Sequence, residues 1–313
     1  MKKKNILITG GAGFLGSKLA TKLVYLGYNV FVVDLQFYSN DSLDHLTSFD
    51  NFHFSKSDIR NEKIVKKIVK NMDYIIPLAA LVGAPLCDKK KKIAVDTNVN
   101  AIKKIIKFSK KKQKLIYLTS NSGYGIGQKD KFCDENSPLN PVSLYGRTKN
   151  ESEKLVMKRK NCVCFRLATV FGYSFRMRTD LLVNNFVYTA MSTNALKIFE
   201  GSFRRNFIHI DDVVDGIIFS IQNFNKLKNN VYNMGLSSAN ITKLELAKKI
   251  KKFIPKVKIT KILNQQDPDK RDYFVSNDKI ERKGFAARKS LESGIIELIK
   301  IFKKNLKKYK NNY

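Results

Sequence analysis

The sequence lacks the features that mark several large classes of protein. Its 313 residues include no tryptophan, four cysteines, three histidines and six prolines. No apolar run approaches the roughly 18 residues that a membrane-spanning helix needs, so we expect no membrane insertion. The basic start Met1–Lys4 leads into a short strand pattern without a small-residue cleavage site. We therefore expect no export signal and a cytoplasmic location.

The number and spacing of the cysteines and histidines argue against a fold held together by disulfides or by a bound metal. The cysteines show no CxxC spacing, and the histidines lie far apart in the sequence. A chain of this length can bury a proper core without disulfides. These patterns predict neither a disulfide framework nor a metal site, and Cys162 and Cys164 are expected in the core.

Acidic residues are scarce, with 27 against 59 lysines and arginines and a formal net charge of +32. Such a charge can indicate a nucleic-acid or membrane-surface partner. Here the lysines are spread over the whole chain beside many asparagines and isoleucines, as AT-rich coding produces, rather than gathered in one groove. We expect no nucleic-acid partner, and a small polyanionic substrate remains compatible with the charge.

The first half alternates short apolar runs with helical patterns, which is the signal of βαβ units. The pattern predicts an α/β fold with a doubly wound parallel sheet of the Rossmann type. The expected strands are Asn5–Thr9, Asn29–Asp34, Asn51–Phe54, Tyr74–Leu78, Leu115–Thr119 and Val163–Leu167. The expected helices are Phe14–Leu26, Glu62–Lys70, Ile93–Lys112 and Leu144–Arg159, the third with an apolar stripe at Val95, Val99, Ile102 and Ile106.

The rhythm loosens after Gly172, which predicts two parts around one cleft. Residues 1–172 are expected to form the dinucleotide-binding domain, with segments near 205–235 returning to it. Residues 173–313 are expected to form a smaller, mixed substrate-binding cap. Its elements include helices at Leu181–Met191 and Leu244–Phe253, a helix ending near Ile221 and a strand at Val231–Met234.

A glycine-rich turn follows the first strand and opens the first helix. Gly10, Gly13 and Gly16 give the spacing that makes a tight turn, lets backbone approach a pyrophosphate and packs helix against strand. The phosphates would then sit at the helix N-terminus, beside Phe14 and Leu15.

The second strand ends in an acid, Asp34, eighteen positions beyond Gly16. A carboxylate there accepts hydrogen bonds from ribose hydroxyls and repels a 2′-phosphate. Leu35 and Gln36 follow where an NADP enzyme would often offer arginine. The expected cofactor is NAD.

Tyr145 and Lys149 form a YxxxK pair within a predicted helix, where a spacing of four puts both on one face. A nearby ammonium favours the phenolate, which lets tyrosine act as a general base. The pair alone occurs by chance in many helices. A hydroxyl cluster at Thr119–Ser122, at the carboxyl end of a strand, makes the catalytic interpretation stronger.

These motifs, in this order, together with Leu78–Ala80, Asn98 and Phe165–Gly172, resemble the extended short-chain dehydrogenase/reductases of the NAD-dependent epimerase/dehydratase family. The resemblance implies that Ser120 holds the substrate hydroxyl, Tyr145 removes its proton and Lys149 tunes Tyr145 while binding the nicotinamide ribose. NAD would accept the hydride. It also implies cofactor-lining or supporting roles for Asp58, Ile59, Leu78, Ala79, Ala80 and Asn98.

Relatives in this family bind the diphosphate of a nucleotide sugar with two arginines, which match Arg205 and Arg271 here. From the residues alone, the alternative for Arg205 is a surface position beside Arg204, and the alternative for Arg271, which lies amid acids, is an ion pair. The remaining expected substrate contacts are Asn121, Ser122, Arg176, Arg178 and Asn184. An asparagine common in 4-epimerases aligns near Leu181, so the contacts of that segment stay open.

The residues beside Ser120 narrow the reaction. Sugar 4,6-dehydratases carry Asp-Glu where this chain has Asn121-Ser122, a decarboxylase would need a glutamate there, and the cysteine of 3,5-epimerising relatives is missing. We expect oxidation at C4 of a nucleotide sugar to a 4-keto sugar, or 4-epimerisation of a UDP-hexose. A non-catalytic NAD sensor is a more distant alternative.

Three runs, Ser120–Gly127, Pro138–Lys149 and Arg176–Asn184, are similar to a subgroup from bacterial surface-polysaccharide pathways. That similarity favours GDP-manno-heptose as the substrate. Relatives commonly pair through the two long helices, here Ile93–Lys112 and Leu144–Arg159, so we expect a homodimer or homotetramer.

Overall fold

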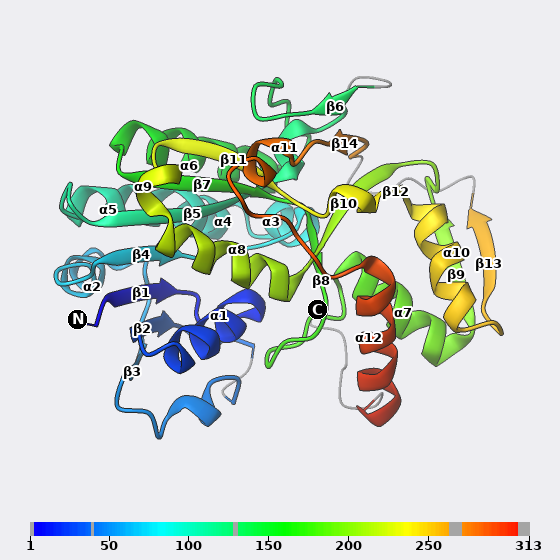
Figure 1. The fold of residues 1–313 in the computed structure, drawn as a ribbon, viewed down its shortest axis with the longest axis horizontal. Coiled ribbons are helices and arrows are strands. Elements are labelled where there is room, and N and C mark those ends of the chain that lie inside the picture. The colour runs from blue at the N-terminus through cyan, green and yellow to red at the C-terminus, as the bar shows by residue number, and fades with distance from the viewer. Residues whose placement is uncertain (1–2, 39–40, 128–130, 263–270, 306–313) are drawn as a thin grey trace.

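A parallel sheet of seven strands forms the centre of the larger lobe in the computed structural model, which describes residues 3–38, 41–127, 131–262 and 271–305 (Figure 1). The strand order across the sheet is β3-β2-β1-β4-β5-β7-β11, and every neighbouring pair is parallel. The strands are β1 (Asn5–Thr9), β2 (Asn29–Asp34), β3 (Phe52–Lys56), β4 (Tyr74–Pro77), β5 (Lys114–Ser120), β7 (Cys162–Leu167) and β11 (Asn230–Met234).

Helices cover both faces of this sheet, which is why its central strands are apolar throughout. One face packs against α1 (Phe14–Tyr25) and α8 (Ile210–Gln222). The other packs against α2 (Glu62–Ile68), α5 (Ala101–Phe108) and α6 (Leu144–Arg159). The predicted doubly wound α/β fold is confirmed.

The long helix expected over Ile93–Lys112 is interrupted. It consists of α4 (Lys91–Val95), a π-helical turn at Asp96–Asn100, and α5, which ends at Phe108. The wider turn shifts the phase of the inward face, so Asn98 is buried and Val95 is exposed. The predicted stripe was therefore wrong at Val95, because a 3.6-residue period cannot anticipate a π turn.

The smaller lobe has its own apolar core, formed by α7 (Leu182–Thr193), α10 (Lys243–Phe253) and α12 (Leu291–Asn305). A parallel pair, β9 (Ala195–Phe199) and β13 (Lys258–Ile262), covers its outer side (Figure 1). Between the lobes lies a sheet of β8 (Thr169–Phe171), β10 (Arg204–His209) and β12 (Asn240–Thr242). The short elements are α3 (Ala84–Lys89), α9 (Phe224–Leu227), α11 (Asp278–Glu281), β6 (Phe132–Cys133) and β14 (Phe274–Val275).

Charged side chains join α12 to the larger lobe. The Asp211 carboxylate at the start of α8 pairs with Lys18 of α1 at 2.8 Å and with Lys289 at 2.5 Å. His209 is fully buried, and its Nε2 lies 2.9 Å from the Glu297 carboxylate of α12. The two lobes are thus linked at one junction through the carboxylates of Asp211 and Glu297.

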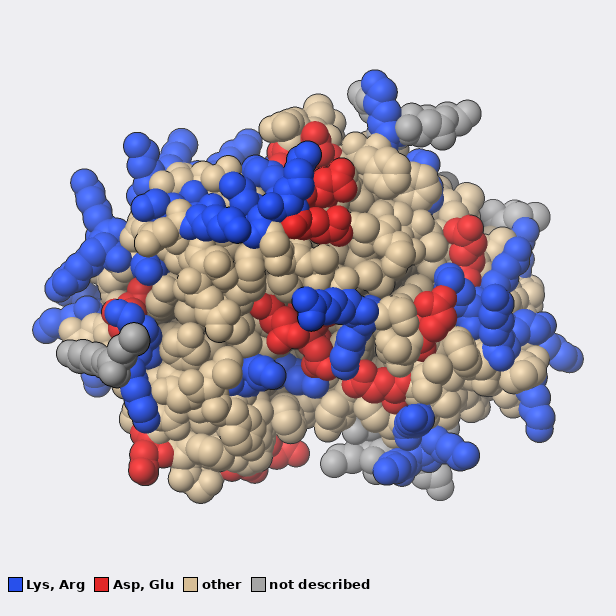
Figure 2. All heavy atoms as spheres, viewed as in Figure 1, with Lys and Arg blue, Asp and Glu red and all other residues tan. Residues whose placement is uncertain are grey.

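The many basic side chains do not collect in one place on the face in Figure 2. Lysines and arginines lie over both ends of the molecule, with acidic residues among them. No helix within the described ranges is long and apolar enough to cross a membrane.

Gly294 lets α12 approach the sheet between the lobes. A Cβ atom there would lie 2.3 Å from Cε2 of buried Phe171 and 3.0 Å from Cδ2 of His209. We expect Gly294→Val to lower the free energy of unfolding by about 2 kcal/mol, because overpacking a close-packed core forces strain. Chemical denaturation measures this. Lys300→Val, at an exposed position of the same helix, should change stability by no more than about 0.5 kcal/mol, and equal losses in both variants would contradict the packing account.

Candidate active site

The turn between β1 and α1 brings backbone close to backbone. Gly10 has a φ of +74°, and a Cβ there would lie 2.4 Å from the Ala79 nitrogen. A Cβ on Gly16 would lie 2.2 Å from the Gly10 carbonyl oxygen. Gly13 caps α1 without any side-chain hydrogen bond, so the first amides of this twelve-residue helix face outward, as anion binding requires.

Asp34 lies at the end of β2, beside this turn. Its carboxylate accepts hydrogen bonds from the backbone N–H groups of Ala12 (3.0 Å) and Gln36 (2.7 Å). The side chain therefore orders the glycine turn, and its remaining lone pairs can accept ribose hydroxyls.

Other residues with expected cofactor contacts mostly shape the walls. The Phe14 side chain is buried in the core of the smaller lobe, and Leu15 packs against the cores of both lobes. Leu78 follows β4, where its N–H donates to the Thr9 carbonyl. Ala79 packs on the α5–α6 side of the sheet, and Ala80 follows it. Any contact that Phe14 makes with a cofactor is limited to its backbone.

Asn98 and Asp58 use their side chains within the protein. The buried Asn98 amide accepts from the Leu81 N–H and donates to the Leu81 carbonyl and the Thr148 hydroxyl. It thereby ties the loop after β4 to α6, a supporting role. Asp58 pairs with Arg60 at 2.7 Å, and this hydrogen bond lowers the pKa of the carboxyl. Ile59, the next residue, is buried.

The three residues expected to carry the chemistry lie at the carboxyl end of β5 and the first turns of α6. Ser120 ends β5, and its hydroxyl accepts from the Ser122 N–H at 3.1 Å. Tyr145 and Lys149 lie one turn apart on α6, which Ser143 caps. The Ser120 hydroxyl lies close enough to the Tyr145 phenol to oppose the rise in its pKa that burial causes. The structure thus brings Ser120 and Tyr145 together at the carboxyl edge of the sheet.

Burial raises the pKa of Tyr145 to about 12, although the charges of Arg271 and Arg178 and the Ser120 hydroxyl oppose the rise. Burial also lowers the pKa of Lys149 to about 7, while Cys164, Glu153 and Cys87 raise it. Proton removal by Tyr145 at neutral pH therefore requires nearby positive charge, and Arg271 and Arg178 supply such charge in the structure.

Several buried polar groups at the carboxyl edge of the sheet have no hydrogen-bond partner within the described part of the chain. They are the hydroxyls of Thr9, Thr119 and Ser122 and the amide of Asn121. Buried polar atoms are rarely left unpaired in native proteins, so a bound molecule is expected to supply their partners. Together with the open helix end at Gly13 and the acid at Asp34, these residues fit a dinucleotide.

The structure rules out the surface alternative for one of the two arginines. Arg205 of β10 is buried, at 3% exposure, so it is not a surface residue. Its neighbour Arg204 pairs with Asp272 at 2.8 Å. Arg271 lies close enough to Tyr145 for its charge to lower the phenol pKa, although most of the acidic loop before it (residues 263–270) lies outside the described residues.

The other expected substrate residues divide into two groups. Arg176 is buried, with its guanidinium 4.3 Å from the Tyr38 ring, and Arg178 pairs with Asp180. The fully buried Asn184 accepts from the Gly172 N–H and donates to the carbonyls of Gly172 and Arg178. Its amide is engaged by backbone, so its place in the structure is that of a positioning residue, in contrast to the substrate contact that the sequence suggested.

The sequence patterns did not identify a buried pair of charged residues that lies beneath the site. Glu153 of α6 and Arg166 of β7 form a buried ion pair at 2.7 Å, and Arg166 also donates to the Tyr124 hydroxyl. Glu153 lies four positions after Lys149, on the same helix face, and that spacing was the available signal.

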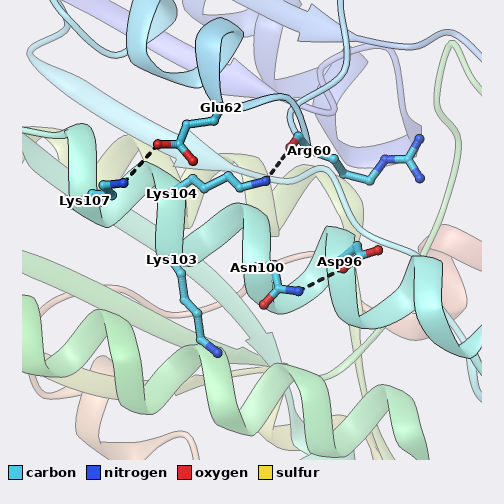
Figure 3. A pocket seen from close by; sticks show the side chains of 7 residues that line it. All are labelled: Arg60, Glu62, Asp96, Asn100, Lys103, Lys104 and Lys107. Carbon is cyan, nitrogen blue, oxygen red and sulfur yellow. Dashed lines mark hydrogen bonds and ion pairs between the residues drawn. The ribbon is translucent and has the colours of Figure 1, made fainter.

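A separate hollow lies between α2 and α5 (Figure 3). It is lined by Arg60, Glu62, Asp96, Asn100, Lys103, Lys104 and Lys107, none of them an expected site residue. Lys107 pairs with Glu62, Lys104 donates to the Arg60 carbonyl, and Lys103 pairs with Glu151 of α6. The lysines are engaged by protein groups, so the hollow is distinct from the site.

Comparison with known protein families identifies the family of this chain. Residues 6–235 match the NAD dependent epimerase/dehydratase family. The chain belongs to this family. It is an enzyme, its cofactor is NAD, and its family comprises nucleotide-sugar epimerases, dehydratases and decarboxylases. The expected NAD dependence is confirmed, and the non-catalytic alternative is set aside.

The relatives described here align with nearly the whole length of this chain. UDP-glucuronic acid decarboxylase 1 of Arabidopsis thaliana is 30% identical over 320 residues, covering 97% of this chain and 71% of the relative. UDP-glucose 4-epimerase of Thermotoga maritima, solved with UDP-glucose, is 26% identical with a TM-score of 0.83, covering 97% of this chain and 100% of that one. UDP-glucuronic acid 4-epimerase of Bacillus cereus, solved with UDP-glucuronic acid and NAD, shares the fold at 24% identity, with a TM-score of 0.85 over 96% and 99% of the chains.

The carboxylate of Asp34 is expected to set the preference for NAD. Asp34→Asn keeps the shape but removes the charge that would repel a 2′-phosphate, so the ratio of NAD to NADP affinity should fall by about tenfold or more. Titration calorimetry with each dinucleotide measures it. Asp44→Asn, an equal charge change at an exposed position, should leave the ratio unchanged. An unchanged ratio in Asp34→Asn would show that another group discriminates.

Proposed function

We propose that the enzyme oxidises the C4 hydroxyl of a nucleotide-activated sugar to a 4-keto sugar. One observation carries the proposal. Ser120 lies close enough to the Tyr145 phenol to affect its pKa, and the buried Lys149 lies one helical turn from Tyr145, while the adjoining positions, Asn121 and Ser122, bear no carboxylate.

Each catalytic residue has one task in this proposal. The Ser120 hydroxyl binds the C4 hydroxyl and directs it at Tyr145. The phenolate of Tyr145 takes the hydroxyl proton as the C4–H bond breaks and the C4=O bond forms. The Lys149 ammonium stabilises that phenolate and offers hydrogen bonds to a ribose. NAD, when bound, supplies the acceptor for the hydride that leaves C4.

The neutral pair Asn121-Ser122 argues against elimination of water. Dehydration requires an acid for the leaving hydroxyl and a base for the neighbouring carbon–hydrogen bond. An amide and a hydroxyl supply neither at neutral pH. Their buried, unpartnered atoms are instead suited to hydrogen bonds with sugar hydroxyls or cofactor.

The arginines indicate the activating group. The Arg205 guanidinium lies 5.9 Å from the ring of Tyr273, two residues after Arg271, and the charge of Arg271 acts on Tyr145. Guanidinium groups bind phosphate oxygens with two parallel hydrogen bonds. We propose that these two arginines bind the diphosphate and that Arg176 and Arg178 contact sugar or phosphate. The resemblance of the catalytic segments to surface-polysaccharide enzymes supports GDP-manno-heptose as the sugar nucleotide.

A 4-epimerase acting on a UDP-hexose is the second candidate, because the structural relative from Thermotoga maritima is a UDP-glucose 4-epimerase. The two reactions share the first step. They differ in whether the keto sugar leaves or rotates and takes back the hydride, and this depends on how tightly the product is held.

A substrate panel distinguishes these candidates. We expect purified enzyme with NAD and GDP-manno-heptose to form NADH in proportion to a product two hydrogens lighter. Spectrophotometry and mass spectrometry follow both. An isomer of unchanged mass from a UDP-hexose, without net NADH, would establish the epimerase instead, and no reaction with any GDP- or UDP-sugar would overturn the proposal.

Tyr145→Phe tests the proposed base within the same assay. Loss of the phenol should lower kcat by about 10²–10⁴-fold, the usual contribution of a general base, with little change in NAD affinity. Tyr25→Phe removes an exposed hydroxyl on α1 and should behave as the parent. Wild-type turnover in Tyr145→Phe would assign the proton transfer to another group.

Arg271→Gln tests the diphosphate contact. We expect KM for the sugar nucleotide to rise by about tenfold or more, because a charge-assisted, two-point contact is lost. The exposed Arg282→Gln matches the charge change and should leave KM unaltered. Steady-state kinetics measures both, and equal KM values would place the diphosphate elsewhere.

A further inference from the structure

We propose that Tyr117, buried in β5, is a positioning residue whose ring face keeps the ammonium of Lys149 charged in an otherwise apolar setting. The inference rests on the proposed function only in calling Lys149 catalytic. Its core, a contact between a cation and a ring, concerns this chain alone.

The contact is close and dry. The Lys149 Nζ lies 4.3 Å from the centroid of the Tyr117 ring. Lys149 is 6% exposed and Tyr117 1% exposed, so water does not screen the pair. An ammonium over an aromatic face is attracted by the ring quadrupole, most strongly when both are desolvated. The ring therefore partly replaces the hydration that Lys149 loses on burial.

The other groups around Lys149 come from three elements and supply limited compensation. Burial raises the pKa of the Cys87 thiol (α3) to about 11 and holds that of the Cys164 thiol (β7) well above its ordinary value, so both are neutral at pH 7. On α6, burial likewise raises the pKa of Tyr145.

Glu153, the acid in reach of Lys149 on α6, is bound by Arg166 of β7, so much of its field is cancelled. The face of the Tyr117 ring therefore remains as a group that stabilises the charge of Lys149 and whose effect no neighbouring charge cancels. Its own phenol is neutral, because burial raises the pKa of that hydroxyl.

The ring rather than the hydroxyl carries this role. The Tyr117 hydroxyl is buried and has no hydrogen-bond partner in the described part of the chain, and the nearby Ser152 hydroxyl donates to the Asn98 carbonyl at 2.6 Å. A phenylalanine at 117 would keep the face under Lys149 and remove only this unpartnered hydroxyl. A leucine would keep the apolar volume and lose the face.

The matched pair Tyr117→Phe and Tyr117→Leu provides the test. NMR of enzyme labelled at lysine Cε, with the Lys149 signal assigned by its loss in Lys149→Arg, reports the pKa of Lys149 without substrate. We expect the Phe variant to keep the parental value of about 7 and the Leu variant to titrate about one pH unit lower. Equal titration in the two variants would overturn the proposal.

Kinetics gives an independent reading if the proposed reaction is confirmed. The ammonium is present below its pKa and lost as pH rises through it, so a lower pKa moves the alkaline fall of kcat to lower pH. We expect that movement in Tyr117→Leu and not in Tyr117→Phe. An inactive wild type would refute the proposed function and leave the NMR result standing.

Thermal melting and the NAD affinity of each variant serve as controls that the variant is folded. Should Tyr117→Leu fail to fold, fluorinated phenylalanines at position 117 replace it, since successive fluorines weaken the face while keeping the shape. A stepwise fall in the pKa of Lys149 along that series supports the proposal. A constant pKa refutes it.

Discussion

The buried ion pair between Glu153 and Arg166 is the constraint on which the geometry of the site depends. It joins α6, which carries Tyr145 and Lys149, to β7, and through the Tyr124 hydroxyl it fixes the turn that follows Ser120. Two charges are buried at 4% and 5% exposure, and removing either partner of such a pair typically costs about 3–5 kcal/mol. Any other placement of α6 on the sheet would separate the two buried charges and leave each without its partner, so such placements are disfavoured. The Glu153–Arg166 pair therefore fixes the relative positions of Ser120, Tyr145 and Lys149, although it includes none of the three.

Local sequence patterns were sufficient for the elements that build the sheet. Strands Asn5–Thr9 and Asn29–Asp34 and helix Leu144–Arg159 have the predicted bounds, because apolar runs between glycines and a Ser143 cap are local signals. The π turn around Asn98 and the helix at Leu291–Asn305 were not predicted. The first depends on the amide of Asn98 reaching Leu81 and Thr148, which are tertiary contacts. The second does carry a local signal, because its buried residues Leu291, Ile295, Leu298 and Phe302 recur at helical spacing.

The candidate site divides in the same way. Motif spacing placed Ser120 and Tyr145 together, and in the structure the two side chains lie close enough for Ser120 to affect the pKa of the phenol. Spacing could not show that Asn184 is engaged by backbone or that Arg204, rather than Arg271, pairs with Asp272. A polar residue near a site has the same appearance in sequence whether it faces a ligand or a carbonyl. Only its hydrogen bonds separate these cases, and those depend on segments distant in the chain.

The charges around Tyr145 suggest why a single buried lysine matters in so basic a protein. In the free enzyme Arg271 and Arg178 both lower the pKa of the phenol. A diphosphate bound to arginines in this region would cancel much of their field at Tyr145, because its negative charges lie nearer to the guanidinium groups than the phenol does. Lys149 is too deeply buried to be neutralised in that way. Its charge, supported by the Tyr117 ring and limited by a pKa of about 7, would then set the basicity of Tyr145 at the moment when substrate is bound.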